Sequence, residues 1–441
     1  MMDENKELFD RCVDVLHKND KGNHTKPASG LYPHQWLWDS CFIAIGLRHV
    51  DVERAKIEIE SLFRAQWANG MIPHLIFEPD HAYKTERNIW KSWSSPFSPD
   101  TVSTSGITQP PLLAEAIWLI GEKMPKIDRN IWFKKLLGGL IRHHEWLYNE
   151  RDPHSEGLTL QIHPYETGLD STPSWQVQLH EHSKPWWIEV VEKLHLDGLV
   201  NLLRRDTRFV PPGQRMTNID ALLYWDVIRR FRRKGWDITR ILHRSEFCIE
   251  DVTFNSILVR ANKRLNQIAK VCRIKIPEHL SESMRKTEKA LNTLWDEQTE
   301  QFYCRDFITH DLITEPTIGG LMPLYAGTIS KLHISKLHDL LRDHRQYWTN
   351  HPVPSVPLTS KFFSDERYWQ GPSWVNTNWL IIDGLKRCGY PDQAEELRQK
   401  TIETVKKSGV FEYFSPVDGR GLGAPNFSWT AALIIDLLSE D

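Results

Sequence analysis

"SWVNTNWLIIDGLKRCGYPDQAEELRQKTIETVKKSG", residues 373–409, contains two amphipathic patterns on either side of a short polar connection. Apolar residues recur at three- and four-residue intervals over 373–389 and again over 392–409, the periodicity of a helix with one buried face. The connection "CGYPDQ" supplies glycine and proline, which end helices and form turns. The stretch therefore predicts two consecutive helices joined by a short loop.

The same helical periodicity dominates the rest of the chain. It recurs over 51–66, 110–124, 128–150, 186–205, 218–235, 251–270, 282–297, 335–346 and 428–440. Alternating strand patterns are almost confined to short pieces such as "FYCRDF" at 302–307. We therefore expect an all-α protein with roughly a dozen helices.

The connections between these helices are of two kinds. Some are short and polar, whereas others are long and rich in Trp, Pro, Gly and Ser: 67–109, 151–185, 346–373 and 409–427. Long loops in a compact helical domain usually carry function. No stretch resembles a flexible linker, so we expect residues 1–441 to form a single domain. An (α/α)6 barrel, with its long loops building a pocket at one end, fits this alternation best; an irregular helical array is the alternative.

Composition limits the classes of function. The 441 residues carry 55 basic and 58 acidic side chains, so no strong field favours nucleic acid or anionic lipid. Six scattered cysteines without a CxxC pair suggest a reduced, cytoplasmic chain, and we expect neither an export signal nor a membrane span. The 19 tryptophans suit the apolar faces of sugar rings, although they also suit a core. Whether the chain forms a homo-oligomer is left open.

Four loop stretches gather aromatic and acidic side chains. "GLYPHQWLWDSCFIAIG" (30–46) brings Tyr32, Trp36 and Trp38 to Asp39, which on local grounds could equally be a helix N-cap. "IHPYETGLDSTPSW" (162–175) contains Asp170, which by itself would be interpreted as a turn residue. The other two are "RYWQGPSWVNTNW" (367–379), with Tyr368, Trp369 and Trp374, and "GVFEYFSPVDGRGLGAPNFSW" (409–429). In the last, Glu412 lies between aromatics, and a partly buried Glu needs a partner or a function.

Five motifs occur in an order that resembles a known family. They are "WLWDS" (36–40), "GITQPPLLAEA" (106–116), "HPYETGLDSTP" (163–173), "YWQGPSW" (368–374) and "FEYFSPVDGRGLGAPNFSWTAAL" (411–433). Together they resemble glycoside hydrolase family 63 and its clan relatives, above all the compact glucosylglycerate and mannosylglycerate hydrolases. The resemblance spans nearly the whole chain.

The resemblance implies an inverting α-glycosidase of small α-glucosides or α-mannosides, with Asp170 as general acid and Glu412 as general base. In that mechanism the acid protonates the leaving oxygen and the base activates a water across the sugar, with the carboxyl groups roughly 6.5–9.5 Å apart. The acid must therefore stay protonated near neutral pH while the base stays ionised.

The resemblance also implies a substrate pocket. The residues that would line the glycone side are Tyr32, Trp36, Trp38, Asp39, Gln109, Tyr368, Trp369 and Trp374. Arg204 is similar in position to the family's cation for the glycerate carboxylate. Two positions depart from the family pattern, since Ser171 replaces an Asn and Tyr165 replaces a Trp, which puts the aglycone side in doubt. The serine-rich segment 88–106 is similar to a loop that closes over substrate, or is a plain surface loop.

Other hypotheses predict different products. A trehalase-like or other α-glucosidase would cleave neutral oligosaccharides, a non-catalytic barrel would bind sugar without cleaving it, and an epimerase would use paired histidines on a reducing sugar. His143-His144 and the His180 and His182 pair lack the further ligands of a metal site. We therefore expect no metal and no cofactor.

Overall fold

The structure, a computed structural model, describes residues 2–182, 184–202, 204–243, 245 and 248–439. Its architecture is a ring of helices within a second ring, the (α/α)6 barrel that the alternating connections predict. Six helices form the inner ring: α2 (Leu37–Leu47), α5 (Leu113–Glu122), α11 (Val252–Cys272), α13 (Pro323–Ala326), α15 (Val375–Cys388) and α17 (Ser428–Leu438). Each packs against the next in this order, and α17 packs against α2, which closes the ring.

The outer ring has a different sequence pattern from the inner one. Its helices are α1 (Met2–Asn19), α3 (Val52–Arg64), α6 (Lys126–Arg151), α12 (Glu278–Ala290), α14 (Lys331–Leu341) and α16 (Pro391–Ser408). Every residue of α2 is buried, whereas α3 buries only one face, around Ile59 and Leu62. Because α2 is covered on all sides it is apolar on nearly all sides, and each buried Leu or Ile contributes roughly 1.5–3 kcal/mol.

The lengths of the connections decide which end of the barrel carries loops. Each inner helix except α17, the last helix, leads into the following outer helix through a short turn, such as Gly389–Tyr390 between α15 and α16. Each outer helix leads back to the next inner helix through a long connection, the longest being 152–251. All long connections therefore gather over the N-terminal ends of the inner helices, as the sequence predicts.

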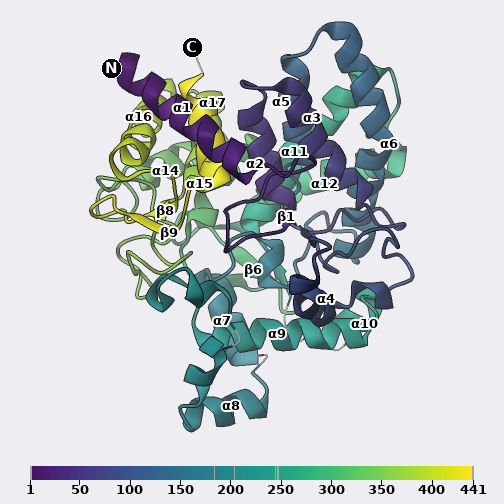
Figure 1. Cartoon of the computed structure of the whole chain (residues 1–441), viewed down its shortest axis with the longest axis vertical. Helices are drawn as coiled ribbons and strands as arrows, with labels where there is room; N and C mark the ends of the chain where they lie inside the picture. The colour runs from purple at the N-terminus through teal and green to yellow at the C-terminus, as the bar shows by residue number, and fades with distance from the viewer. Residues whose placement is uncertain (1, 183, 203, 244, 246–247, 440–441) are drawn as a thin grey trace.

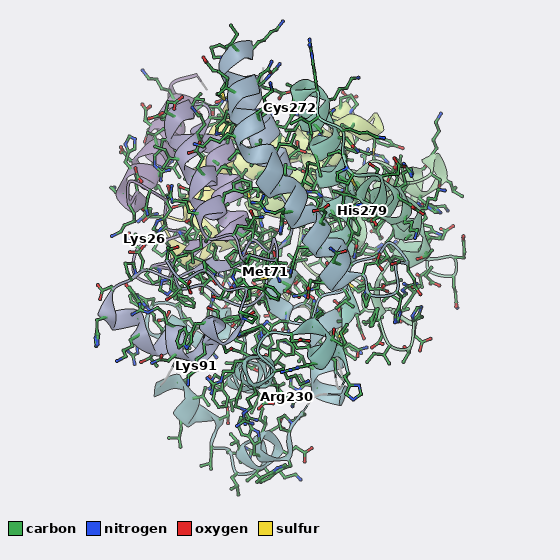
Figure 2. The ribbon with its side chains drawn as sticks, turned by 90° about the vertical axis from the view of Figure 1, so that its right-hand side faces the viewer. Lys26, Met71, Lys91, Arg230, Cys272 and His279 are labelled. Carbon is green, nitrogen blue, oxygen red and sulfur yellow. The ribbon has the colours of Figure 1, made fainter. Side chains whose placement is uncertain are left out.

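Five further helices lie within the long connections: α4 (Lys84–Trp90), α7 (Pro173–His182), α8 (Trp186–Lys193), α9 (Asn218–Arg233) and α10 (Ile238–Leu242). They lie together below the barrel in Figure 1. The perpendicular view agrees, with Lys91 and Arg230 in this lower part and Cys272 and His279 among the barrel helices above (Figure 2).

The strands are short and belong to the loops. They are β1 (Gln35–Trp36), β2 (Leu75–Ile76), β3 (Ile249–Glu250), β4 (Trp295–Asp296), β5 (Gln301–Phe302), β6 (Cys304–Asp306), β7 (Leu312–Ile313), β8 (Phe411–Phe414) and β9 (Gly421–Pro425). They pair antiparallel as β1-β2, β3-β6-β7, β4-β5 and β8-β9. The β8-β9 hairpin, at the end of the last long connection, presents Glu412.

Some helix boundaries differ from the sequence-based expectation. The helix expected over 186–205 ends at Lys193, because His195 adopts a left-handed backbone with φ of +53° that a helix cannot continue through. The helix expected over 282–297 changes to a 3-10 turn at Leu291 and then to β4. Helices α4 and α7 lie within stretches interpreted as loops. Within the described part of the chain, no helix is long and apolar enough to cross a membrane.

Candidate active site

A cavity of about 360 Å³ opens among the long connections at the N-terminal ends of the inner helices. Ten of the twelve site residues expected from the sequence line it: Tyr32, Trp36, Trp38, Asp39, Gln109, Tyr165, Asp170, Arg204, Tyr368 and Glu412. They come from five different connections and from the first turn of α2, so only the closed ring brings them together. The aromatic lining with a few acidic groups is suited to a small polar ligand with apolar ring faces.

One wall of the cavity presents Glu412 on strand β8, where its side chain is buried. Its Oε1 accepts hydrogen bonds from the Tyr32 hydroxyl at 2.7 Å and from Arg215 at 3.3 Å. Its Oε2 accepts the backbone N–H of Ala424 at 3.0 Å, from the partner strand β9. Three donors stabilise the negative charge and fix the position of the carboxylate.

Gly423 in strand β9 makes room for this carboxylate. Its φ is +70°, and a Cβ placed there would lie 2.5 Å from Glu412 Oε2 and 2.5 Å from the Tyr413 ring. Both the backbone conformation and the contact distance therefore require glycine. The glycines that follow Glu412 in the sequence thus have a local structural reason.

The other wall presents Asp170, at the end of the 163–170 loop, with part of its surface toward the cavity. The Tyr368 hydroxyl donates to Asp170 Oδ2 at 3.4 Å, a long hydrogen bond, and the Tyr224 hydroxyl donates to the Asp170 carbonyl. Burial raises the pKa of the Asp170 carboxyl to about 7, with a smaller contribution from the charge of Glu412, against the lowering effect of Arg215. Asp170 can therefore hold a proton at neutral pH.

The 163–170 loop is fixed by the contacts of Glu166 and by its close approach to α2 at Gly168. Glu166 accepts hydrogen bonds from the backbone of Ile162 at 2.8 Å and of Thr108 at 3.3 Å, and forms a buried ion pair with Arg151 at 2.8 Å. Gly168 has φ of +72°, and a Cβ there would lie 2.5 Å from the Trp38 ring. The loop can therefore approach α2 closely enough to bring Asp170 to the cavity.

Asp39 lies within the first turn of α2, and the N-cap position belongs to Trp36, so the capping interpretation of Asp39 is wrong. Burial, with the charges of Glu412 and Asp170, raises the pKa of Asp39 well above its usual range. Gln109 accepts the backbone N–H of Trp38 at 3.3 Å, which ties the connection before α5 to the start of α2.

Arg215 is the main residue that the sequence did not suggest. It is buried, pairs with Glu412, and places its guanidinium 4.2 Å from the centre of the Tyr368 ring. It also pairs with Asp206 at 3.3 Å. Since it acts on both walls, Arg215 sets the charge balance between Glu412 and Asp170. Its neighbours "PGQRM" carry no helical or strand pattern that would single it out.

Arg204 and Arg205 both line the cavity and both have partners. Arg204 is buried and forms a bidentate pair with Asp206, so it is not a solvated helix-end residue. Arg205 pairs with Glu86 at 3.4 Å and donates to the Gly30 carbonyl at 2.6 Å.

Trp369 and Trp374 do not line the cavity, which corrects the expectation that they would. Their rings stack in parallel with centroids 3.7 Å apart, and both are almost fully buried. The Trp374 indole donates to the Tyr368 carbonyl at 3.3 Å. The pair therefore supports Tyr368, whose φ of +34° is unusual for a residue with a side chain.

Some further lining residues lie within the segments 409–429 and 88–106. Phe427 and Trp429 follow the β8-β9 hairpin, and Trp90 and Ile89 belong to α4. The aromatic sequence "NFSW" was a usable signal for the first two. Of the serine-rich segment 88–106, only its first residues reach the cavity.

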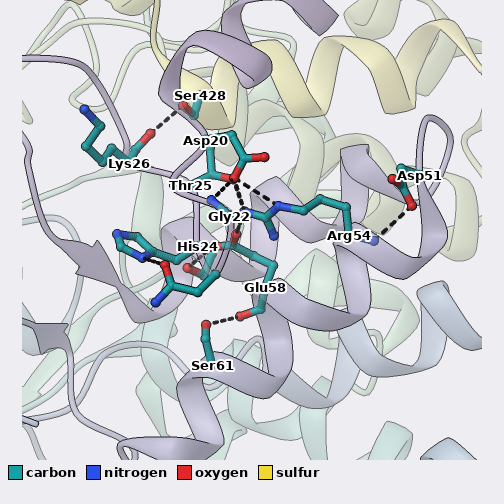
Figure 3. A network of polar contacts seen from close by, with 12 residues as sticks. Asp20, Gly22, His24, Thr25, Lys26, Asp51, Arg54, Glu58, Ser61 and Ser428 are labelled. Atoms are coloured by element: carbon teal, nitrogen blue, oxygen red, sulfur yellow. Dashed lines mark hydrogen bonds and ion pairs between the residues drawn. The ribbon is translucent and has the colours of Figure 1, made fainter.

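A polar network holds the segment that leads to Tyr32 (Figure 3). Arg54 on α3 pairs with Asp20 at 2.8 Å and with the buried Glu58 at 2.9 Å. Ser428, at the start of α17, donates to the Lys26 carbonyl at 2.6 Å. Residues 20–26 are thereby fixed to two helices before the chain reaches the cavity wall.

Potential metal ligands gather away from the cavity. Among the described residues, one group of three, His154, Glu156 and His310, has ligand atoms within 4.8 Å of one another. All three are exposed, none lines the cavity, and Glu156 already pairs with Arg305 at 3.2 Å. His143 and His144 are buried, and burial lowers the pKa of His143 to about 3.

An (α/α)6 barrel whose cavity sets a protonatable carboxyl against a carboxylate held by three donors has the groups that a glycoside hydrolase needs, one acid and one base. Comparisons with known proteins agree. A family model described as the mannosylglycerate hydrolase MGH1-like glycoside hydrolase domain matches residues 32–430. The chain therefore belongs to this family, within glycoside hydrolase family 63.

Individual relatives cover nearly the whole chain. The mannosylglycerate hydrolase of Thermus thermophilus is 36% identical over 96% of this chain and 99% of that protein. The glucosylglycerate hydrolase of Mycolicibacterium hassiacum is 30% identical over 98% of each. A crystal structure of a family 63 mannosylglycerate hydrolase from Thermus thermophilus, in complex with Tris and D-glycerate, has a TM-score of 0.86 at 34% identity and covers 97% of this chain and 99% of its own.

Proposed function

We propose that this chain hydrolyses α-mannosylglycerate or α-glucosylglycerate to the free sugar and glycerate, with inversion at the anomeric carbon. Relatives named for each of these two activities align over nearly the full length, and one is solved with D-glycerate bound. The observation that carries the proposal is the contrast between the two carboxyl groups, since Asp170 has a pKa of about 7 whereas Glu412 is held by three donors.

In the proposed reaction Asp170 gives its proton to the glycosidic oxygen as the bond to the sugar breaks. Glu412 accepts a proton from a water molecule that attacks the anomeric carbon from the opposite face. The raised pKa of Asp170 supports the first role, because an acid with a pKa near the working pH is still protonated and can still transfer its proton. A carboxylate has about four acceptor sites, and the one that Glu412 keeps free after its three hydrogen bonds supports the second role.

Substrate binding follows from the lining of the cavity. Trp36 and Trp38 offer apolar faces and edges to the sugar, and Asp39 offers acceptor and donor positions to its hydroxyl groups. Arg204 and Arg205 line the cavity and are the proposed contacts of the glycerate carboxylate, although each is paired with a protein carboxylate. We further propose that residues 1–441 act as one catalytic domain, in the cytoplasm, where the six free cysteines stay reduced.

A hydrolysis screen with the purified protein tests the proposal. Mannosylglycerate, glucosylglycerate, trehalose and kojibiose would be offered in parallel, and proton NMR would record the first anomer formed. The proposal expects a glycerate glycoside to be cleaved fastest and a β-sugar to appear first. Release of an α-sugar first would contradict inversion, and a preference for trehalose or kojibiose would contradict the substrate.

The second candidate is a hydrolase of neutral oligosaccharides. One observation favours it: Arg204, the cation expected to bind the glycerate carboxylate, already forms a bidentate pair with Asp206. The same screen separates the two candidates.

A further inference from the structure

Three arginines line the cavity, and each has a carboxylate partner in the protein. Arg204 pairs with Asp206 and Arg205 with Glu86. Arg215 is shared between Asp206 and Glu412. Each of these three guanidinium groups is therefore already paired with a carboxylate of the protein, and none offers an incoming carboxylate an unpaired positive charge. If the substrate is a glycerate glycoside, as proposed above, its carboxylate must bind an arginine that is already paired with a protein carboxylate.

Arg204 has almost no free donors. A guanidinium has five N–H groups. Arg204 Nε and Nη2 donate to the two carboxylate oxygens of Asp206, and Nη1 donates to the Met216 carbonyl at 2.8 Å and to Asn218 Oδ1 at 2.9 Å. One N–H remains, whereas bidentate binding of a carboxylate needs two. A substrate carboxylate can therefore occupy this fork only if Asp206 leaves it.

Asp206 would still have favourable contacts if it moved away from Arg204. It is the more accessible member of the pair, with 20% of its side chain exposed against 8% for Arg204. Its Oδ2 also accepts from Arg215 Nε at 3.3 Å. Moving away from Arg204 would thus leave Asp206 with a cation and with solvent, so the exchange does not strand a buried charge.

We propose that Asp206 is a specificity-determining residue: it occupies the guanidinium of Arg204 as an internal counter-ion, and a carboxylate-bearing aglycone binds by taking its place. This inference rests on the proposed function and adds to it the residue that sets how strongly an anionic aglycone is preferred. Discrimination between two ligands depends on the difference in their binding free energies. Because Asp206 competes with an anionic aglycone for Arg204, it weakens binding of the anionic ligand and reduces the preference for it over a neutral one.

Asp206→Asn tests the inference, because asparagine keeps the size and removes the charge. We would measure kcat/KM for a glycerate glycoside and for the matching glycerol glycoside, in which a neutral CH₂OH replaces the carboxylate. The ratio of the two values is expected to rise on the order of fivefold, chiefly through a lower KM for the anion. Any loss of Glu412 alignment through Arg215 would lower both values and cancel in the ratio.

If Asp206 merely holds Arg204 in place, the same variant misplaces the cation and the ratio falls. An unchanged or lower ratio therefore overturns the inference. Glu86→Gln is the matched control, since it removes a carboxylate of the same cavity wall that pairs with Arg205 instead. An equal rise in both variants would mean a general charge effect and would also overturn the specific role of Asp206.

A failure of the proposed function can be distinguished from a failure of this inference. If the wild-type protein cleaved the glycerol glycoside but not the glycerate glycoside, the substrate assignment would be wrong. Inhibition of the neutral reaction by free D-glycerate would then still test Asp206. Asp206→Asn should lower the inhibition constant of D-glycerate several-fold and leave that of glycerol unchanged, and equal inhibition constants in variant and wild type would overturn the inference.

Discussion

The two walls of the cavity hold the same chemical group in opposite ways. Glu412 stands on a paired strand, and three donors from Tyr32, Arg215 and Ala424 converge on its carboxylate. Asp170 stands at the end of an irregular loop, and the hydrogen bond that its carboxyl accepts from Tyr368 is long, at 3.4 Å. Burial without compensating donors favours the protonated form, and convergent donors favour the charged form. The surroundings of each carboxyl group, more than its residue type, therefore distinguish the proposed acid from the proposed base.

The largest effect should come from removing the base. Glu412→Gln keeps the shape of the side chain and its contact with Ala424, but the amide cannot accept a proton from water. We expect kcat to fall about 10³-fold with little change in KM, measured by glycerate release. Circular dichroism would establish that the variant is folded, and near-normal turnover in a folded variant would exclude Glu412 as the base.

The next largest effect should come from Arg215, which touches both walls. Arg215→Met keeps a long side chain against Tyr368 but removes the charge, and we expect kcat to fall roughly 10²-fold. Because Arg215 lowers the pKa of Asp170, the variant should also move the alkaline limb of kcat/KM to higher pH. A merely structural loss would lower activity without moving that limb.

The pH dependence of the wild-type enzyme sharpens the comparison. Asp170 must be protonated to act, and its protonated fraction falls as pH rises through a pKa of about 7. We therefore expect kcat/KM to decline by about tenfold per pH unit on the alkaline side. A profile that stays flat from pH 6 to 9 would mean that no group with such a pKa controls the reaction.

The smallest effect should come from Tyr32. Tyr32→Phe removes one of the three donors to Glu412 and leaves Arg215 and Ala424 in place, so we expect kcat to fall about fivefold. Tyr165→Phe is a matched control, because its hydroxyl also belongs to a cavity-lining tyrosine but makes no contact with Glu412 among the described hydrogen bonds. A loss of the same size in both variants would indicate a general effect of the cavity wall.

Much of the fold was predictable from the sequence, because periodicity and connection length are local properties. The pair over 373–409 appears as α15 and α16, and the alternation of short and long connections predicts the barrel. The inner helix α13, Pro323–Ala326, was not predicted, because a single helical turn is too short to show a hydrophobic period. The expected helix over 186–205 failed where one residue, His195, takes a left-handed backbone that its apolar neighbours do not signal.

The site was predictable only in part. The aromatic and acidic motifs marked both walls, but they could not separate Trp36, which faces the cavity, from Trp374, which supports it from behind. Arg215 and Asp206 lie in polar loops without a pattern, and the role of Arg215 depends on its contact with Glu412 from another connection. Such pairings arise only when the ring closes.

The most direct test of the two-wall account compares two substrates in one variant. Asp170→Asn cannot protonate a leaving group, and a glycerate glycoside needs that proton, whereas the α-fluoride of the same sugar leaves as fluoride without it. The account predicts that Asp170→Asn loses about 10³-fold in kcat on the glycerate glycoside but stays within about tenfold of wild type on the fluoride. Equal losses on both substrates, or normal cleavage of the glycerate glycoside, would contradict it.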